Sequence, residues 1–490
     1  MSKRKKSPNK GRTGGGRVTP KGTRPGDRPG EPTGWAALGE AGLGGAMAGG
    51  SGDQQFAGTG FDLGLDLPDG LGVGFDGGVP ERAAGDPFGP MVEAFREVDL
   101  GDPLQVELWV SDLVGAFVDE FRQKELRNDT PWDTGDDDLP SEAEFFYDFV
   151  GGLSRRIVDD EPQWAQLLAA IAPFLDAAAQ SKAALDLEAV DPSVVEFAAS
   201  VGRAVVEETF LLDHETDDGH HIGLVARHPG AAEPHLVMAF VDSNLGGMAS
   251  DILVSADVEG VRVEAASQGL VASSLEPAEA QARLQQALQR TDMTMMAPVE
   301  EDFPLLRPLL ESVMRSLPEP SRLVAAEPPS DEELDAVVES IVEASAEVFD
   351  DELTPERLRD TARLVTRFMS REMGRSPLAW SPARLEILLC DFVPRKVPVP
   401  PEALASLPGE LAALVPAAQR LAGWEDRHVG FTLAMIERVT PEFMELVASD
   451  EVREPAKRLA MRAIDDDVDL DDPDAVAALV ERMRSEGSGA

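Results

Sequence analysis

Apolar residues are distributed unevenly along this chain of 490 residues, and their distribution limits where a core can form. They make up 43% of the sequence. Before residue 100 they are sparse, Gly, Pro, Ser and Thr are abundant, and no helical or strand period persists. Burial cannot offset the entropy lost on ordering such a segment. We therefore expect residues 1–100 to be a disordered basic arm and Gly-rich linker that precede the folded body.

Charge also changes sign along the chain. Residues 1–28 hold ten Lys or Arg and one acid, Asp27. Of the 44 basic and 90 acidic residues in the whole chain, 34 and 89 remain in the body, a net charge near −55. An arm of this kind can contact an anionic surface that the body itself repels. The arm residues that we expect to make such contacts are Lys3, Arg4, Lys5, Lys6, Lys10 and Arg12.

Helical periodicity dominates two regions of the body, residues 101–202 and residues 331–490. In the first region it predicts helices from about 103, then at 141–158, 162–175 and 192–200. Ser141 and Glu144 have the spacing of a capping box. A proline-punctuated linker at 318–330 leads to the second region, where Ser330 and Glu333 form another capping box and helix follows throughout. Residues 394–401 (PRKVPVPP) are predicted to be an extended connector.

A strand-like pattern occupies the middle of the chain. Runs at 203–213, 220–227 and 235–242 are joined by Gly, Asp and Pro turns, which predicts an antiparallel meander. Residues 261–265 are predicted to add a fourth strand, and residues 277–289 return to helix. The expected fold class is mainly α with a small α+β insertion (an antiparallel three- to four-stranded meander at 203–317) behind a disordered N-terminus.

Composition excludes several classes of protein. The single cysteine, Cys390, rules out an internal disulfide framework and a CxxC metal site, and its apolar helical surroundings indicate a small core residue. No apolar stretch of signal-peptide type follows the basic start, and no run of about 18 apolar residues is present. We expect a cytoplasmic protein without membrane contact. The motifs of P-loop nucleotidases, zincins and α/β hydrolases are missing, so no catalytic residue is assigned.

Two other patterns resemble ligand-binding motifs in residue spacing or composition but lack the context or the key residues of those motifs. Gly72, Gly74 and Gly77 have the spacing of a dinucleotide fingerprint, but no strand precedes them and Pro80 follows. The run DDDVDLDDPD (465–474) lacks the glycine and the final glutamate of a calcium-binding loop. We interpret it as a solvated acidic linker.

Five of the six histidines lie between residues 214 and 235, and four of them form two pairs, each across one predicted turn. The pairs are His214 with His220, and His228 with His235. Eight strand steps of about 3.3 Å, or roughly 26 Å, separate the pairs, so they cannot share one ion. We favour polar strand ends at solvent; the alternative is a two-histidine site completed by Glu215 or Asp217. No metal or cofactor is predicted.

Residues 242–247 (DSNLGG) follow the third predicted strand, and loops at strand ends often carry binding groups. Asp242 and Asn244 offer hydrogen-bond acceptors and a donor, and Gly246 permits close approach of a ligand. The alternative is that Asn244 and Gly246 make a tight turn.

The run VMAFVDSNLGGMASDILV (237–254) and the block PLAWSPARLEILLCDFVPRKV (377–397) resemble an uncharacterised protein family of high-GC Gram-positive (actinobacterial) bacteria. The likeness covers about residues 200–465. The loop of those relatives resembles V-D-H-N-L-G, and their block resembles W-S-P…E-I-L-L…W-x-P-R-K. Ser243 stands here in place of that histidine, and Phe392 in place of the second tryptophan. The resemblance implies a shared architecture and brings no known activity.

We therefore expect a non-enzymatic binding or interaction protein. Its arm either contacts nucleic acid weakly, with a log–log salt slope near −5 for about six phosphate contacts, or screens its own acidic body. An unknown protein is a further partner class. The alternative function is that of an enzyme or small-ligand-binding protein that uses Asp242, Asn244 and Gly246 with the neighbouring histidines.

Overall fold

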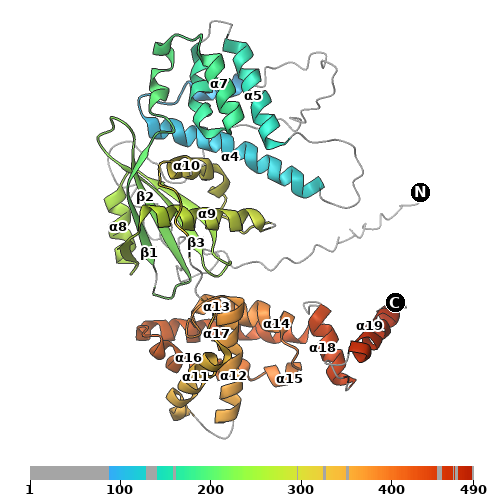
Figure 1. Ribbon diagram of the computed structural model, residues 1–490. Coiled ribbons are helices and arrows are strands. Elements are labelled where there is room, and N and C mark those ends of the chain that lie inside the picture. The colour runs from blue at the N-terminus through green and yellow to red at the C-terminus, as the bar shows by residue number, and fades with distance from the viewer. Residues whose placement is uncertain are drawn as a thin grey trace, which may run out of the picture.

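The structure is a computed structural model, and it describes residues 88–128, 141–157, 162–213, 215–294, 296–323, 327–348, 353–449, 455–466, 468 and 473–487. The basic arm, most of the Gly-rich linker and half of the 465–474 run lie outside these residues. The described part is mainly helical with one antiparallel sheet, which confirms the predicted fold class. Figure 1 shows the sheet between an N-terminal and a C-terminal group of helices.

The N-terminal group packs around one apolar core that includes Val110, Phe149 and Leu167. The predicted capping box is present: the Ser141 backbone N–H donates to Glu144 Oε2 at 2.9 Å, and the Glu144 N–H donates to Ser141 Oγ at 3.3 Å. The helices of this group are α3 (Gly89–Phe95), α4 (Pro103–Asn128), α5 (Glu142–Ile157), α6 (Pro162–Ile171) and α7 (Ala177–Leu187). Because Phe95 of α3 is buried in the core, the folded region begins before the boundary predicted at residue 101.

The helix predicted at 192–200 is replaced by short 3-10 turns, so that prediction was wrong. The turns are η3 (Pro192–Val194) and η4 (Glu196–Ala199), and a third, η2 (Ala172–Phe174), follows α6. Val195 has φ −115° and ψ 13°, outside the α-helical range, and it separates η3 from η4. The α-helix of this region is instead the alanine-rich α7, which Asp176 caps by accepting from the backbone of Ala178 and Ala179.

The sheet has five antiparallel strands in the order β4-β3-β2-β1-β5. They are β1 (Val205–Asp213), β2 (Gly219–Arg227), β3 (His235–Asp242), β4 (Met248–Ser255) and β5 (Val271–Ser274). The first three match the predicted runs. The fourth strand predicted at 261–265 was wrong, because those residues belong to helix α8 (Val258–Ser267). Asp257 caps α8 through the Gly260 N–H at 2.8 Å, and Val263 is 61% exposed, whereas a strand would bury it with Val261.

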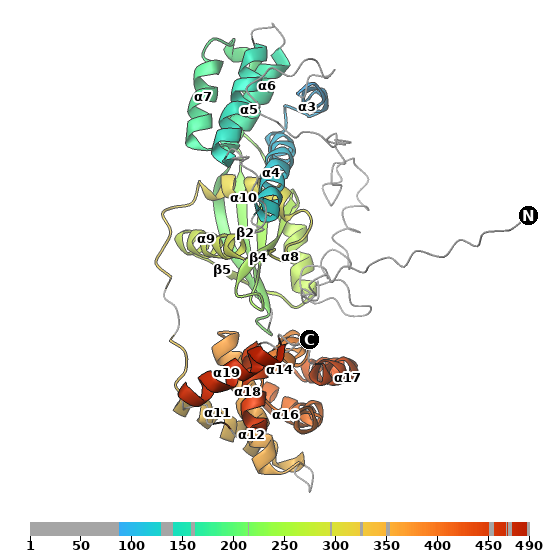
Figure 2. The same cartoon turned by 90° about the vertical axis from the view of Figure 1, so that its right-hand side faces the viewer.

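Helices cover both faces of the sheet. Helices α9 (Pro277–Met293) and α10 (Phe303–Met314) share a core with one face, and α8 packs on the other. Figure 2 shows α8 and α9 on opposite sides of the strands. Helix α10 also touches α4: Ser111 Oγ donates to the Leu305 carbonyl at 2.6 Å and accepts from the Leu309 N–H at 2.9 Å. The N-terminal helices are thereby joined to the sheet.

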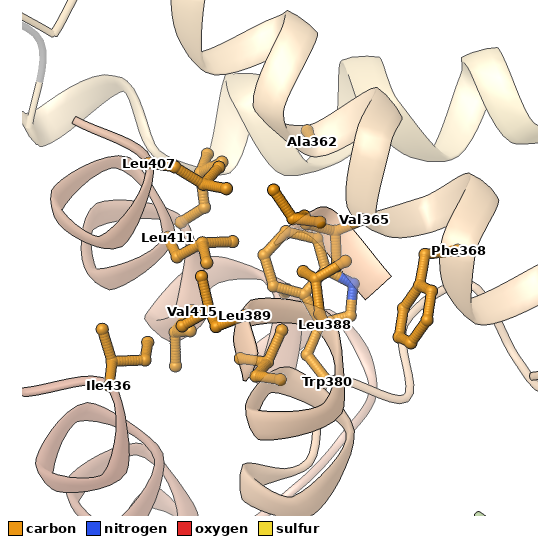
Figure 3. Close-up of a cluster of buried hydrophobic side chains, with 14 of the residues drawn as sticks. Ala362, Val365, Phe368, Trp380, Leu388, Leu389, Leu407, Leu411, Val415 and Ile436 are labelled. Carbon is orange, nitrogen blue, oxygen red and sulfur yellow. The ribbon is translucent and has the colours of Figure 1, made fainter. Parts of the chain in front are cut away.

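The C-terminal group is helical, as predicted, and the capping box of Ser330 and Glu333 opens it. Trp380 lies fully buried at its centre, next to Val365 and Leu388 (Figure 3). Its elements are α11 (Asp331–Ala344), η5 (Ala346–Val348), α12 (Pro355–Arg367), η6 (Phe368–Glu372), α13 (Pro382–Ile387), η7 (Leu388–Phe392), α14 (Val393–Lys396), α15 (Pro401–Leu404), α16 (Leu407–Leu421), α17 (Asp426–Ala448), α18 (Pro455–Asp465) and α19 (Pro473–Gly487). Helix α14 takes the first part of the predicted connector, so only residues 397–400 lack helix there. None of the described helices combines the length and apolar character that crossing a membrane requires.

Candidate functional site

The 242–247 loop connects β3 to β4 and forms a compact turn. Asp242 Oδ1 accepts from the backbone N–H groups of Asn244 at 2.7 Å and Leu245 at 3.2 Å, and the Asp242 carbonyl accepts from the Gly247 N–H at 2.8 Å. Gly246 has φ +76° and Gly247 φ +78°, a left-handed conformation that favours glycine. The residues proposed for ligand binding thus also make the tight turn that was the alternative.

A side chain from the C-terminal helices enters this turn. Arg384, in the first turn of α13, is fully buried. Its Nε donates to Asn244 Oδ1 at 2.9 Å, its Nη1 donates to the Thr216 carbonyl at 3.0 Å, and its Nη2 donates to the Asp217 carbonyl. Residues 216 and 217 lie in the turn between β1 and β2. The guanidinium therefore joins two loops at one end of the sheet to α13.

Acidic groups surround this guanidinium. Asp218 Oδ1 lies 3.7 Å from Arg384 Nε and accepts from Asn244 Nδ2 at 3.1 Å and from Ser381 Oγ. Burial raises the pKa of Asp242 to about 6, and the nearby Asp218 charge adds to that rise. Both polar atoms of the Asn244 side chain are engaged within the protein. We call the set Arg384, Ser381, Asn244, Asp218 and Asp242 the arginine joint.

A second polar contact reinforces the arginine joint. Glu215, in the same β1–β2 turn, lies with its Oε2 2.8 Å from His428 Nε2 of α17. Its Oε1 accepts from the Glu425 N–H at 3.0 Å. Glu215 was a predicted partner of the strand histidines, but the structure pairs it with a histidine of the C-terminal helices. Asp217, the other predicted carboxylate, lies 3.5 Å from Arg375.

The histidines of the strands are more buried than expected. His221, His228 and His235 are 3%, 4% and 3% exposed, so the interpretation of these residues as solvent-facing strand ends was wrong. Burial lowers the pKa of His220 and of His235 to about 4. His214 lies outside the described residues. The predicted pairing of His228 with His235 is present, since their rings stack with centroids 4.8 Å apart.

Glu107 of α4 completes a cluster with this histidine pair. Its carboxylate and one nitrogen of each imidazole all lie within 4.8 Å of one another, and the three residues are buried. His228 Nε2 is 2.9 Å from Glu107 Oε1. Glu107 is the carboxylate that sequence reasoning missed, because about 120 residues separate it from the histidines. We call Glu107, His228 and His235 the Glu–His–His cluster.

The structure also describes the surroundings of Cys390 and of Asp466 in the acidic run, two residues that the sequence analysis considered. Cys390 is half-buried against the C-terminal core, in agreement with the core interpretation. Asp466, in the acidic run, lies 3.1 Å from Arg462 and 3.4 Å from Arg482. The six arm residues and Gly72, Gly74 and Gly77 lie outside the described residues.

Sequence reasoning also missed Arg384, Ser381 and His428. The available signal was the Ser381-Pro382 helix start, which puts Arg384 at the third helical position beside the cap. The two segments that carry the family resemblance meet here, since Asn244 belongs to one and Arg384 to the other. Comparisons with protein-family models, curated protein sequences and solved structures found no match in any of the three.

Proposed function

We propose that this protein is a non-catalytic cytoplasmic binding protein whose basic arm contacts the phosphates of nucleic acid. The observation that carries the proposal is the separation of charge: ten basic residues and one acid in residues 1–28, against 34 basic and 89 acidic residues in the rest. A body of that charge repels a polyanion, so any contact with nucleic acid falls to the arm.

The surroundings of the 242–247 loop favour this proposal over ligand binding at the loop. Both side-chain atoms of Asn244 bond to Arg384 and Asp218, and the Gly246 carbonyl accepts from Arg290 at 2.6 Å. A ligand would have to displace these bonds and expose a buried guanidinium. The raised pKa of Asp242 is explained by its burial beside Asp218. The polar groups that suggested a binding loop thus hold the β-sheet to the C-terminal helices.

Charge pairing within the body favours nucleic acid over the body as the arm's partner. Many described carboxylates already have arginine partners, such as Glu207 with Arg227 and Asp292 with Arg307. Duplex DNA carries one negative charge for about every 1.7 Å of its axis and releases counterions when a cation binds. Nucleic acid therefore offers the arm a regular row of phosphates and the release of counterions, whereas some carboxylates of the body are already paired.

The test is retention of the full chain on immobilised duplex DNA and on RNA as a function of salt. A variant with Gln at Lys3, Arg4, Lys5, Lys6, Lys10 and Arg12 should lose most binding, and the wild-type log–log slope should be near −5. A comparison variant with Gln at the other four basic residues of the arm, Arg17, Lys21, Arg24 and Arg28, should retain most of that slope.

Two outcomes would reject nucleic-acid contact by the arm. One is equal retention of the wild type and the six-residue variant on both columns. The other is retention that grows when residues 1–28 are deleted. Weakened cross-linking of the arm to the body in the six-residue variant, together with unchanged retention, would instead support intramolecular screening.

A further inference from the structure

The Glu–His–His cluster joins the N-terminal helices to the sheet. Glu107 projects from α4, His228 directly follows β2, and His235 is the first residue of β3. Their side chains are 1%, 4% and 3% exposed. A carboxylate and two imidazoles at this depth need partners for their polar atoms, since an unpaired buried polar group is costly.

The cluster does not supply those partners internally. Glu107 Oε2, His228 Nε2 and His235 Nε2 make no hydrogen bond among the described residues. His228 Nε2 lies 2.9 Å from Glu107 Oε1, but this contact lacks hydrogen-bond geometry. An ion pair between those two residues would also leave Glu107 Oε2 and His235 Nε2 without a partner. A bound group that accepts a lone pair from each of the three side chains explains the unpaired polar atoms better than an ion pair does.

We propose that Glu107, His228 and His235 bind a divalent transition-metal ion, for which Zn²⁺ is the best match. Two imidazole nitrogens and one carboxylate oxygen form a ligand set that zinc uses with a fourth, exchangeable position. Imidazole disfavours Mg²⁺ and Ca²⁺, which prefer oxygen ligands. The three ligand atoms lie within 4.8 Å, and tetrahedral bonds of about 2.0 Å require about 3.3 Å between ligands. Closing that difference requires rotations of the three side chains about the bound ion, including the stacked rings of His228 and His235.

The surroundings are suited to holding such an ion. The Gly202 N–H donates to Glu107 Oε1 at 2.7 Å, which fixes the carboxylate as hydrogen bonds to metal ligands commonly do. The turn between His228 and His235 is mostly exposed, so an ion can reach the buried ligands by a local movement. A bound ion would cross-link α4 to the β2–β3 turn, residues more than 100 positions apart in the chain.

The experiment uses the untagged full chain, stripped with EDTA and titrated calorimetrically with Zn²⁺ in about 0.15 M salt with excess Mg²⁺, which occupies surface carboxylates. One zinc ion per chain is expected. Glu107→Gln and His228→Asn should each weaken binding by at least about 100-fold, because groups that only orient ligands already contribute 10–100-fold. The matched control is His220→Gln, which alters a histidine near the opposite end of β2 and should bind zinc as the wild type does.

Co²⁺ provides a second measurement that does not depend on the folding of variants. Tetrahedral nitrogen and oxygen ligation should give strong visible d–d absorption without a thiolate charge-transfer band, which excludes Cys390. Wild-type protein that binds less than one zinc ion, or a weak six-coordinate cobalt spectrum, overturns the proposal. So does unchanged zinc affinity in both Glu107→Gln and His228→Asn when circular dichroism shows them folded. The arm takes no part, so neither result bears on nucleic-acid contact.

Discussion

Two buried polar clusters lie at opposite ends of the strand pair β2 and β3, and they differ in how their polar atoms are paired. The arginine joint surrounds the pairing of Gly219 with Asp242, and the Glu–His–His cluster lies next to the pairing of Ala226 with His235. In the joint, Arg384 has acceptors on three segments. In the cluster, three buried atoms have no hydrogen-bond partner among the residues that the structure describes.

This difference separates a structural network from a binding site. A satisfied buried network holds its segments in one arrangement and leaves no atom for a ligand. An incompletely satisfied one costs free energy unless a further group completes it. The sequence favoured the polar loop as the binding site and predicted no metal at the histidines, whereas hydrogen-bond pairing points to the histidines.

The largest expected effect comes from breaking the arginine joint. Arg384→Met removes the positive charge beside Asp218 and takes the guanidinium donor away from Asn244 Oδ1 and from the carbonyls of Thr216, Asp217 and Ala379. It should lower the free energy of unfolding by about 3–5 kcal/mol in urea denaturation. Arg420→Met, at an exposed position of α16, is the control and should change it by less than about 0.5 kcal/mol. Equal effects of the two substitutions would show that the joint contributes nothing special.

The second-largest expected effect is the pH dependence of the stability that Asp242 contributes to the arginine joint. The folded-state pKa of Asp242 is about 6 against an ordinary 3.8, so the folded protein binds this proton more tightly than the unfolded chain. The resulting stability is present below about pH 4 and is lost as pH rises to 6, by up to about 3 kcal/mol. Asp242→Asn keeps the acceptor oxygen and removes the titration. Denaturation in EDTA should therefore show the wild type losing stability relative to the variant between pH 4 and 6, and a constant difference would refute this.

Zinc should bind at the Glu–His–His cluster only, so it tests whether that cluster and the arginine joint stabilise the protein independently. At a free concentration of 100 times the dissociation constant, it should raise the free energy of unfolding by about 2.7 kcal/mol. The gain should be the same in wild type and in Arg384→Met, because sites far apart contribute additively. Glu107→Gln, which is expected to bind zinc at least about 100-fold more weakly, should gain no more than about 0.4 kcal/mol. A zinc effect abolished by Arg384→Met would mean that the two clusters form one cooperative unit.

The smallest expected effect is the stability change on substituting Gly246 in the 242–247 turn. Gly246→Ala places a side chain at φ +76°, and no atom of the described residues lies within 4 Å of the new Cβ. Only the backbone conformation is therefore penalised, by about 1 kcal/mol. Gly409→Ala, in helix α16 and equally uncrowded, should stabilise by about 0.5–1 kcal/mol. Chemical denaturation measures both, and a neutral Gly246→Ala would show that the loop adapts and does not demand glycine.

Features set by near neighbours in the chain were predictable. The capping boxes of Ser141 and Ser330 lie where their spacing indicated, and three strands follow their predicted runs. The strand prediction at 261–265 failed because Val261, Val263 and Ala265 fit strand alternation, while Val261 and Ala265 by themselves also fit helical spacing. The structure buries Val261 and Ala265 and exposes Val263, which is a helical pattern.

For the candidate site, the sequence by itself determined which chemical groups were present and which histidines could meet across a turn. It placed His228 beside His235 because strand geometry is local. Only the tertiary structure decided that Glu107 joins them and that Arg384 fills the 242–247 loop. Those contacts link segments more than 100 residues apart, and they arise from how helices pack against the sheet, which no local pattern of residues specifies.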